Sequence, residues 1–185
     1  MHTKEELYSN KIFFNAALPL VKVIANDVPS LKKQFAHVHA IIQVSAKDPD
    51  APGGKVGMHF VVNSDEWLVH LNKVDPNPHV ELEFKSVEAM NAFFKGKMSP
   101  ATLPKMKGVV THFGAFKAFL MTLLKMSSLL GATEAPKDEA TKELMVKCFF
   151  YLLSSGISQL NKMGHEDIHD WTSKSPDRVY AWAVD

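Results

Sequence analysis

One segment of this chain carries a residue pattern that proteins use for metal chemistry. His165, Glu166 and His169 have the spacing H-E-x-x-H. On a helix, two histidines four residues apart face the same side and can hold zinc, while the glutamate acts as a general base. Asp167 and Asp170 flank the motif, and no histidine follows it in the sequence to complete the ligand set. We therefore interpret the segment as a solvated helix start, where acidic residues favour the helix dipole, and keep a metal-dependent hydrolase as the weakest alternative.

Histidines also recur on one side of a predicted sheet. Alternation within residues 36–85 places five histidines and two glutamates on the polar side of the strands: His37, His39, His59, His70, His79, Glu81 and Glu83. If Ser64 and Asp65 form a two-residue hairpin, His59 lies directly opposite His70. Two imidazoles bind a transition metal only weakly, so we expect a water-facing polar surface here and no metal site.

The sequence offers no other catalytic constellation. It contains no G-x-S-x-G, P-loop or G-x-G-x-x-G motif, and no nucleophile stands beside a recognisable base. The sequence therefore predicts a protein that is not an enzyme and that needs no cofactor.

Composition narrows the class of protein further. The 185 residues are 46% hydrophobic and 22% charged, which is typical of one globular domain. The net charge of +1 comes without a basic block, so nucleic acid is not an expected partner. Residues 12–21 are apolar, but Glu5 and Glu6 precede them and Asn15 interrupts them, which argues against a signal peptide. The single cysteine, Cys148, fits a reducing compartment, and we expect a cytoplasmic protein.

The period of the apolar residues predicts an α+β fold. A helical period covers residues 3–26, and the period then changes to two in a series of short strands joined by turns: 36–46, 56–63, 66–73 and 79–85. Consecutive short connections predict an antiparallel meander with one buried and one wet face. The remaining predictions are a helix over 86–96 capped by Ser86, a strand over 105–111, helices over 114–130 and 138–163, and a last strand over 179–184.

The segment 114–130, GAFKAFLMTLLKMSSLL, is predicted to form a helix with almost no polar face. Its only charges are Lys117 and Lys125. A surface helix confines its apolar residues to one stripe, so this helix needs cover on several sides from protein, membrane or ligand. The chain also has nine Met and twelve Phe, and flexible methionines suit adaptable binding surfaces.

The order of these elements resembles the sterol carrier protein 2 family of non-specific lipid-transfer proteins. The resemblance rests on the strand 80–84, the helix that begins at Ser86 and ends in Gly96-Lys97, and the sequence Lys105-Met106-Lys107-Gly108 before an apolar helix. It implies a twisted antiparallel sheet of five strands with helices on one face that enclose an apolar tunnel. It divides the chain into an N-terminal helical segment 1–35, a lipid-binding core 36–131 and a C-terminal helical extension 132–185.

We therefore predict a lipid carrier that holds a fatty acid, sterol or phospholipid in an internal cavity. Such a carrier could also contact membranes transiently. The predicted cavity wall comes from two helices: Met90, Phe94, Phe113, Phe116, Leu120, Leu123 and Leu124. Apolar stripes of this kind also form ordinary cores. The alternative is an interaction module whose apolar helices are buried in a homodimer, with the helix 138–163 at the seam.

Overall fold

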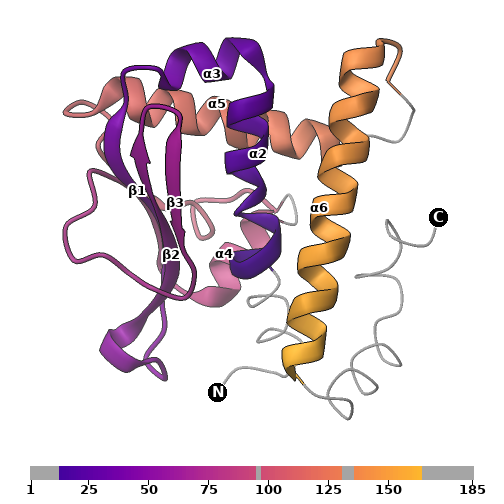
Figure 1. Ribbon diagram of the computed structural model, residues 1–185. Helices are drawn as coiled ribbons and strands as arrows, with labels where there is room; N and C mark the ends of the chain where they lie inside the picture. Colours follow the sequence, from indigo (N-terminus) through magenta and orange to yellow (C-terminus); the bar gives the residue numbers. More distant parts are fainter. Residues whose placement is uncertain (1–12, 95–96, 131–135, 164–185) are drawn as a thin grey trace.

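The computed structural model describes residues 13–94, 97–130 and 136–163, and it confirms the α+β class. A five-stranded sheet forms one layer, helices cover one of its faces, and a long C-terminal helix stands outside them (Figure 1). The strands are β1 (His39–Lys47), β2 (Lys55–Asn63), β3 (Glu66–His70), β4 (Val80–Phe84) and β5 (Lys105–Lys107). The helices are α2 (Leu20–Asp27), α3 (Pro29–Phe35), α4 (Val87–Phe94), α5 (Phe113–Leu130) and α6 (Glu139–Met163), with short turns η1 (Phe13–Ala17) and η2 (Pro52–Gly54).

Most element boundaries agree with the sequence prediction. The Ser86 hydroxyl accepts a hydrogen bond of 3.1 Å from the backbone N–H of Ala89, so Ser86 caps α4 as expected. The predicted N-terminal helix is interrupted in its described part, where Pro19 separates η1 from α2. Helix α3 was not predicted, because Pro29 begins a helix at its first position instead of ending one. The strand 179–184 and the H-E-x-x-H segment lie outside the described residues.

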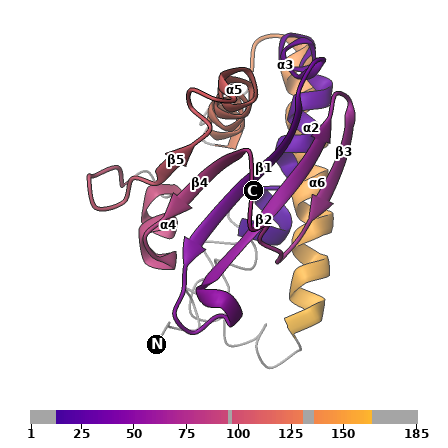
Figure 2. The same cartoon turned by 90° about the vertical axis from the view of Figure 1, so that its left-hand side faces the viewer.

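The sheet differs from the predicted meander in one pairing. The strand order is β3-β2-β1-β4-β5, and β4 pairs with β1 in parallel, while the other neighbours are antiparallel. The prediction of an all-antiparallel sheet is therefore wrong at β4, and the sheet is mixed. Residues 71–79 do not make a hairpin turn. They cross the outer face of the sheet from the edge strand β3 to the start of β4 on the far side of β1, as Figure 2 shows from that side.

This crossing segment buries the polar face that we expected to meet water. The Gln43 side chain accepts a 2.6 Å hydrogen bond from the backbone N–H of Asp75. His59 bonds through Nδ1 to the carbonyl of Lys73 at 2.8 Å. His59 and Glu81 are buried, so the expectation of a water-facing surface is wrong at these two positions, and Gln43 on the same face is buried as well. The prediction that His59 lies opposite His70 is confirmed, with the two rings stacked at 4.6 Å.

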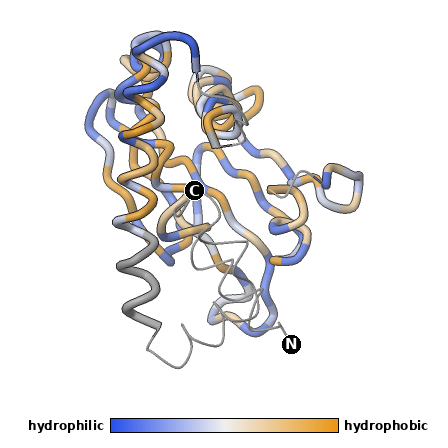
Figure 3. The backbone as a smooth tube through the Cα atoms, turned by 90° about the vertical axis from the view of Figure 1, so that its right-hand side faces the viewer, coloured by the Kyte–Doolittle hydropathy of each residue, from blue (hydrophilic) through white to orange (hydrophobic). Residues whose placement is uncertain are grey.

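The apolar core lies between the other face of the sheet and the helices. Ile42, Val44 and Phe60 on the strands are fully buried, and so are Leu20 and Ile24 on α2. In Figure 3, where the trace is coloured by residue hydropathy, hydrophobic residues recur along the strands and along the helices that cover them. Burial of a side chain of this size contributes about 1.5–3 kcal/mol, so this layer supplies most of the apolar driving force.

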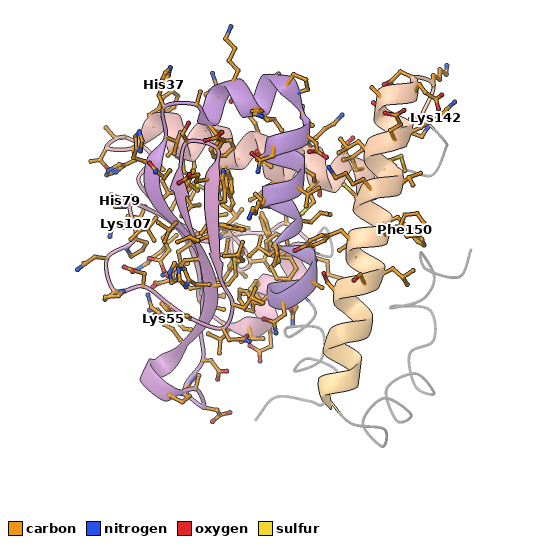
Figure 4. All side chains as sticks on the ribbon, viewed as in Figure 1. His37, Lys55, His79, Lys107, Lys142 and Phe150 are labelled. Atoms are coloured by element: carbon orange, nitrogen blue, oxygen red, sulfur yellow. The ribbon has the colours of Figure 1, made fainter. Side chains whose placement is uncertain are left out.

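Helix α6 packs against η1 and α2 through only part of its surface. Its N-terminus is capped by Asp138, whose carboxylate accepts a 2.8 Å hydrogen bond from the N–H of Thr141. Cys148 and Leu152 are buried, and Lys147 forms an ion pair with Asp27 on α2. On the other side of the helix, Phe150 points away from the body of the molecule (Figure 4). Together with the exposed Val146 it leaves an apolar spot on this side.

Replacement of Gln43 with leucine tests the role of the crossing segment. The substitution removes the partner of the Asp75 N–H and one donor to the buried Glu81 carboxylate. A buried polar group without a partner costs about 1–3 kcal/mol, so the free energy of unfolding should fall by at least that amount in urea denaturation. Gln34→Leu on the exposed side of α3 is the matched control and should change it by less than about 0.5 kcal/mol. Equal unfolding midpoints for the two variants would contradict the anchoring role.

Cys148 gives a second test, this time of α6. Burial raises the pKa of the thiol to about 11, and the nearby Asp27 carboxylate adds to the effect. At pH 8 the native protein should react with a disulfide reagent roughly a hundredfold more slowly than a thiol of ordinary pKa, and urea should restore the rate. Because the unfolded thiol ionises first, stability should also fall as the pH rises from about 9 towards about 11. Rapid labelling of the native protein would show that the side of α6 that carries Cys148 is not packed against η1 and α2.

Candidate functional site

The residues predicted to line a cavity lie in three different environments. Met90, Phe116 and Leu123 are buried in the core. Phe113, Leu120 and Leu124 are exposed at the surface, with exposed fractions of 59%, 38% and 56%. Phe94 is partly buried and belongs to an aromatic cluster described below. The structure therefore does not bring the seven residues together as one wall, and it points to α5 as the element that carries the exposed part.

Gly108 fixes where α5 begins. Gly108 directly follows β5 and has a φ of +87°. Residues other than glycine adopt this backbone conformation only with strain. A Cβ atom at this position would lie 2.4 Å from the carbonyl oxygen of His79, so the chain passes tightly against the start of β4. The backbone N–H of His112 then bonds to the carbonyl of Gly108 at 3.0 Å, and α5 follows. The glycine thus holds the N-terminus of α5 at the β4–β5 side of the sheet.

One face of α5 packs closely on the protein. Phe116, Phe119 and Leu123 are buried, and the helix contacts α2, α3 and β1. Ala118 is fully buried on this face, where a small side chain lets the elements approach. The buried Thr122 hydroxyl is satisfied within the helix, because it donates to the carbonyl of Ala118 at 2.8 Å. This inner face is an ordinary core surface with no polar group left to orient a ligand.

The opposite face of α5 is also apolar, and it is open. Phe113, Leu120 and Leu124 lie along one side of the helix because their spacing matches the helical period. Met121 is exposed beside them. Lys117 is exposed in the same row between Phe113 and Leu120. Three turns of helix therefore present large apolar side chains to the outside with one charge among them. We call this set of residues the outer face of α5.

The sequence did not identify the aromatic cluster beside α4. Phe94 packs on Phe13 at 4.1 Å between ring centroids and on Phe84 at 5.6 Å. Phe93 lies 5.3 Å from Phe84. Phe13 comes from η1, a segment far away in the sequence, so no local spacing could have revealed the contact. The cluster packs aromatic side chains from η1 and α4 around Phe84 of β4.

A pocket near the end of α3 does not suit a lipid. Its volume is about 160 Å³, which is below the 300–1,000 Å³ of typical ligand pockets. Four of its lining residues are polar or charged: Asn26, Lys32, Ser64 and Asp65. An acyl chain would find little apolar wall there.

The polar face of the sheet holds a network that is internally satisfied. The Glu81 carboxylate accepts hydrogen bonds from Gln43 at 2.8 Å and from Ser45 at 2.6 Å. Lys55 pairs with both Glu81 and Glu83. The hydrogen bond from Lys55 lowers the pKa of Glu83, and the same bond raises the pKa of Lys55. These groups satisfy one another through hydrogen bonds and ion pairs, as is typical of a network with a structural role.

Two further findings concern metals and membranes. In residues 13–94, 97–130 and 136–163, no three His, Cys, Asp or Glu side chains converge in a way that could hold a metal ion. In the same described part of the chain, no helix combines the length and the apolar character that a membrane span requires. The H-E-x-x-H segment lies outside these residues, so its interpretation stays a prediction.

Comparisons with known proteins give a partial likeness. No family model matches the chain, and no curated protein matches it. Among solved structures, the chain is similar to the solution structure of a conserved hypothetical protein of Thermus thermophilus, described as a possible sterol carrier protein. The TM-score is 0.36 and the sequence identity 10%, over 78% of this chain and 90% of that one. Membership of the sterol carrier family therefore stays a prediction.

Two adjacent leucines test the division of α5 into two faces. Leu123→Ala should reduce the free energy of unfolding by about 2–5 kcal/mol, because the residue is buried in a packed core. Leu124→Ala removes the same atoms from the exposed face and should change it by less than about 0.5 kcal/mol. Thermal or urea unfolding measures both. If Leu123→Ala were as harmless as Leu124→Ala, Leu123 would line a cavity as the sequence predicted.

Proposed function

We propose that this protein is a lipid carrier that binds a fatty acid, sterol or similar long apolar molecule along the outer face of α5. The observation that carries the proposal is that α5 is apolar on both sides while only one side is covered. Phe113, Leu120 and Leu124 expose large apolar side chains along one side of the helix, with Lys117 among them, and an exposed apolar patch of this kind favours a binding surface. The carrier needs no catalytic group and no cofactor, because burial of the molecule is the whole of its action.

The strength of binding depends on how completely the chain is covered. Full burial gains about 0.8 kcal/mol per CH₂ group. A twelve-carbon chain laid on an open helix face is covered on one side, so it gains about 5 kcal/mol, which corresponds to a Kd on the order of 0.1 mM. A chain enclosed in a tunnel would bind with a Kd in the micromolar range or below. The measured Kd for a simple fatty acid therefore distinguishes an open face from an enclosed tunnel.

The rival proposal is a homodimer that covers these apolar residues with a second copy. The exposed Val146 and Phe150 on α6, four residues apart, favour it because they form one side of the helix. The oligomeric state in solution separates the two proposals.

Titration with dodecanoate, followed by calorimetry, tests the carrier. The double variant Leu120→Ser, Leu124→Ser should weaken binding at least about tenfold, since a loss of only about 1.4 kcal/mol has that effect. Leu68→Ser is the matched control, because Leu68 is 62% exposed on β3 at the opposite edge of the sheet from β5. Its Kd should equal that of the wild type. Binding that the double variant retains in full would place the ligand elsewhere, and a wild type that binds no dodecanoate but is dimeric would favour the rival.

A further inference from the structure

The exposed apolar residues of this protein are concentrated in one segment. Thirteen large hydrophobic residues are exposed in the described part of the chain, and nine of them lie between Met98 and Leu124. Val110 is 87% exposed and Met98 is 70% exposed, although neither belongs to α5. The exposed set therefore extends beyond the outer face of α5 into the loop before β5 and the turn after it. We call this set, together with the lysines named below, the β5–α5 edge.

The elements that carry these residues share one side of the molecule. Figure 2 shows the loop that precedes β5, β5 itself and the start of α5 at the same edge of the sheet, with α5 seen nearly end-on. Strand β5 is the last strand of the sheet, so its outer side has no neighbouring strand in the described part of the chain. The apolar side chains at Met98, Met106 and Val110 therefore protrude from an edge, which suits contact with a broad surface.

The charge of the same segment is one-sided. Residues 97–130 contain five lysines and no aspartate or glutamate, although the whole chain has 20 acidic residues and a net charge of only +1. Lys97, Lys105, Lys107 and Lys117 are exposed. The nearest acidic groups by strand register are Glu81, opposite Lys107, and Glu83, opposite Lys105. Lys55 pairs with both glutamates, and this group of one lysine and two glutamates keeps a charge of −1, which offsets only part of the positive charge of the four exposed lysines.

We infer that the β5–α5 edge docks this protein on the surface of a bilayer that contains anionic lipid. Protruding apolar side chains with lysines around them match the interface of such a bilayer, where the apolar groups enter the acyl boundary and the lysines meet the headgroups. A second copy of the chain fits less well, because the four exposed lysines of the edge would meet the same positive charge on the other copy. Docking does not require that the protein extract a lipid, so this inference goes beyond the proposed function.

Sedimentation with unilamellar vesicles tests the inference. Vesicles of phosphatidylcholine with 30% phosphatidylglycerol should bind the wild type at least tenfold better than vesicles of phosphatidylcholine alone in 20 mM salt. Salt at 0.5 M should remove most of this preference, because it screens exposed charges. Lys105→Gln and Lys117→Gln should each weaken binding about fivefold, the change expected for one lysine near an anionic surface. Lys32→Gln on the exposed side of α3 is the charge-matched control and should have no effect.

Two apolar variants complete the test. Val110→Asp and Met98→Asp should each reduce vesicle binding at least tenfold without a change in melting temperature, since both side chains are exposed. Leu68→Asp at the opposite edge should bind vesicles like the wild type. Neither Val110 nor Met98 belongs to the proposed lipid site on α5, so their variants should keep the wild-type Kd for dodecanoate. Loss of vesicle binding with an unchanged dodecanoate Kd separates docking from carriage.

Several outcomes would overturn the inference. The wild type would fail to bind anionic vesicles at low salt, or it would bind neutral and anionic vesicles equally. Vesicle binding that Val110→Asp and Met98→Asp both leave unchanged would place the contact elsewhere. A wild-type dimer in sedimentation velocity that Val110→Asp converts to a monomer would identify a second copy as the occupant of the edge.

Discussion

The architecture depends on the parallel pairing of β4 with β1. Because β3 already occupies the far edge beside β2, the chain must cross the outer face of the sheet before β4 can begin. The crossing brings backbone N–H and C=O groups over strands that would otherwise meet water, and these groups need partners. Gln43 and His59 supply them through the bonds to Asp75 and Lys73. The polar residues of this face thus bind the crossing segment to the sheet through hydrogen bonds.

The consequence of that pairing is the position of everything that follows in the chain. Once β4 lies beside β1, helix α4 and strand β5 continue at the edge opposite β3. Gly108 then turns the chain tightly against His79, at the point where the crossing segment ends. Helix α5 returns from that edge over the sheet and contacts β1, α2 and α3. The exposed apolar residues at the start of α5 and the exposed lysines at 97, 105, 107 and 117 lie at one edge as a result of the same topology.

Burial and exposure on α5 follow from one geometrical fact. A helix that is apolar all round can place only part of its circumference against the sheet and its helices. The alanines at 115 and 118, with Thr122, lie on the covered side, where small groups allow close packing. Phe113, Leu120 and Leu124 lie on the other side, where no described element covers them. Exposure of these apolar side chains to water is unfavourable, whereas the polar network on the sheet is already satisfied. A functional contact is therefore expected at the surface of α5.

Local patterns in the sequence located most of the elements, but not α3. The period of two located the strands, the Ser86 cap located α4, and the two-residue turn at Ser64 placed His59 opposite His70. Alternation reports which side of a strand is apolar, but it is the same for parallel and antiparallel neighbours, so it could not show that β4 pairs with β1. For the same reason it marked Glu81 and His59 as polar without showing that the crossing segment buries them. The all-round apolar character of 114–130 indicated that the helix needs cover, yet it gave no preferred side. Only the packing of α5 against α2, α3 and β1 decided that Leu123 belongs to the core and that Leu124 faces outward.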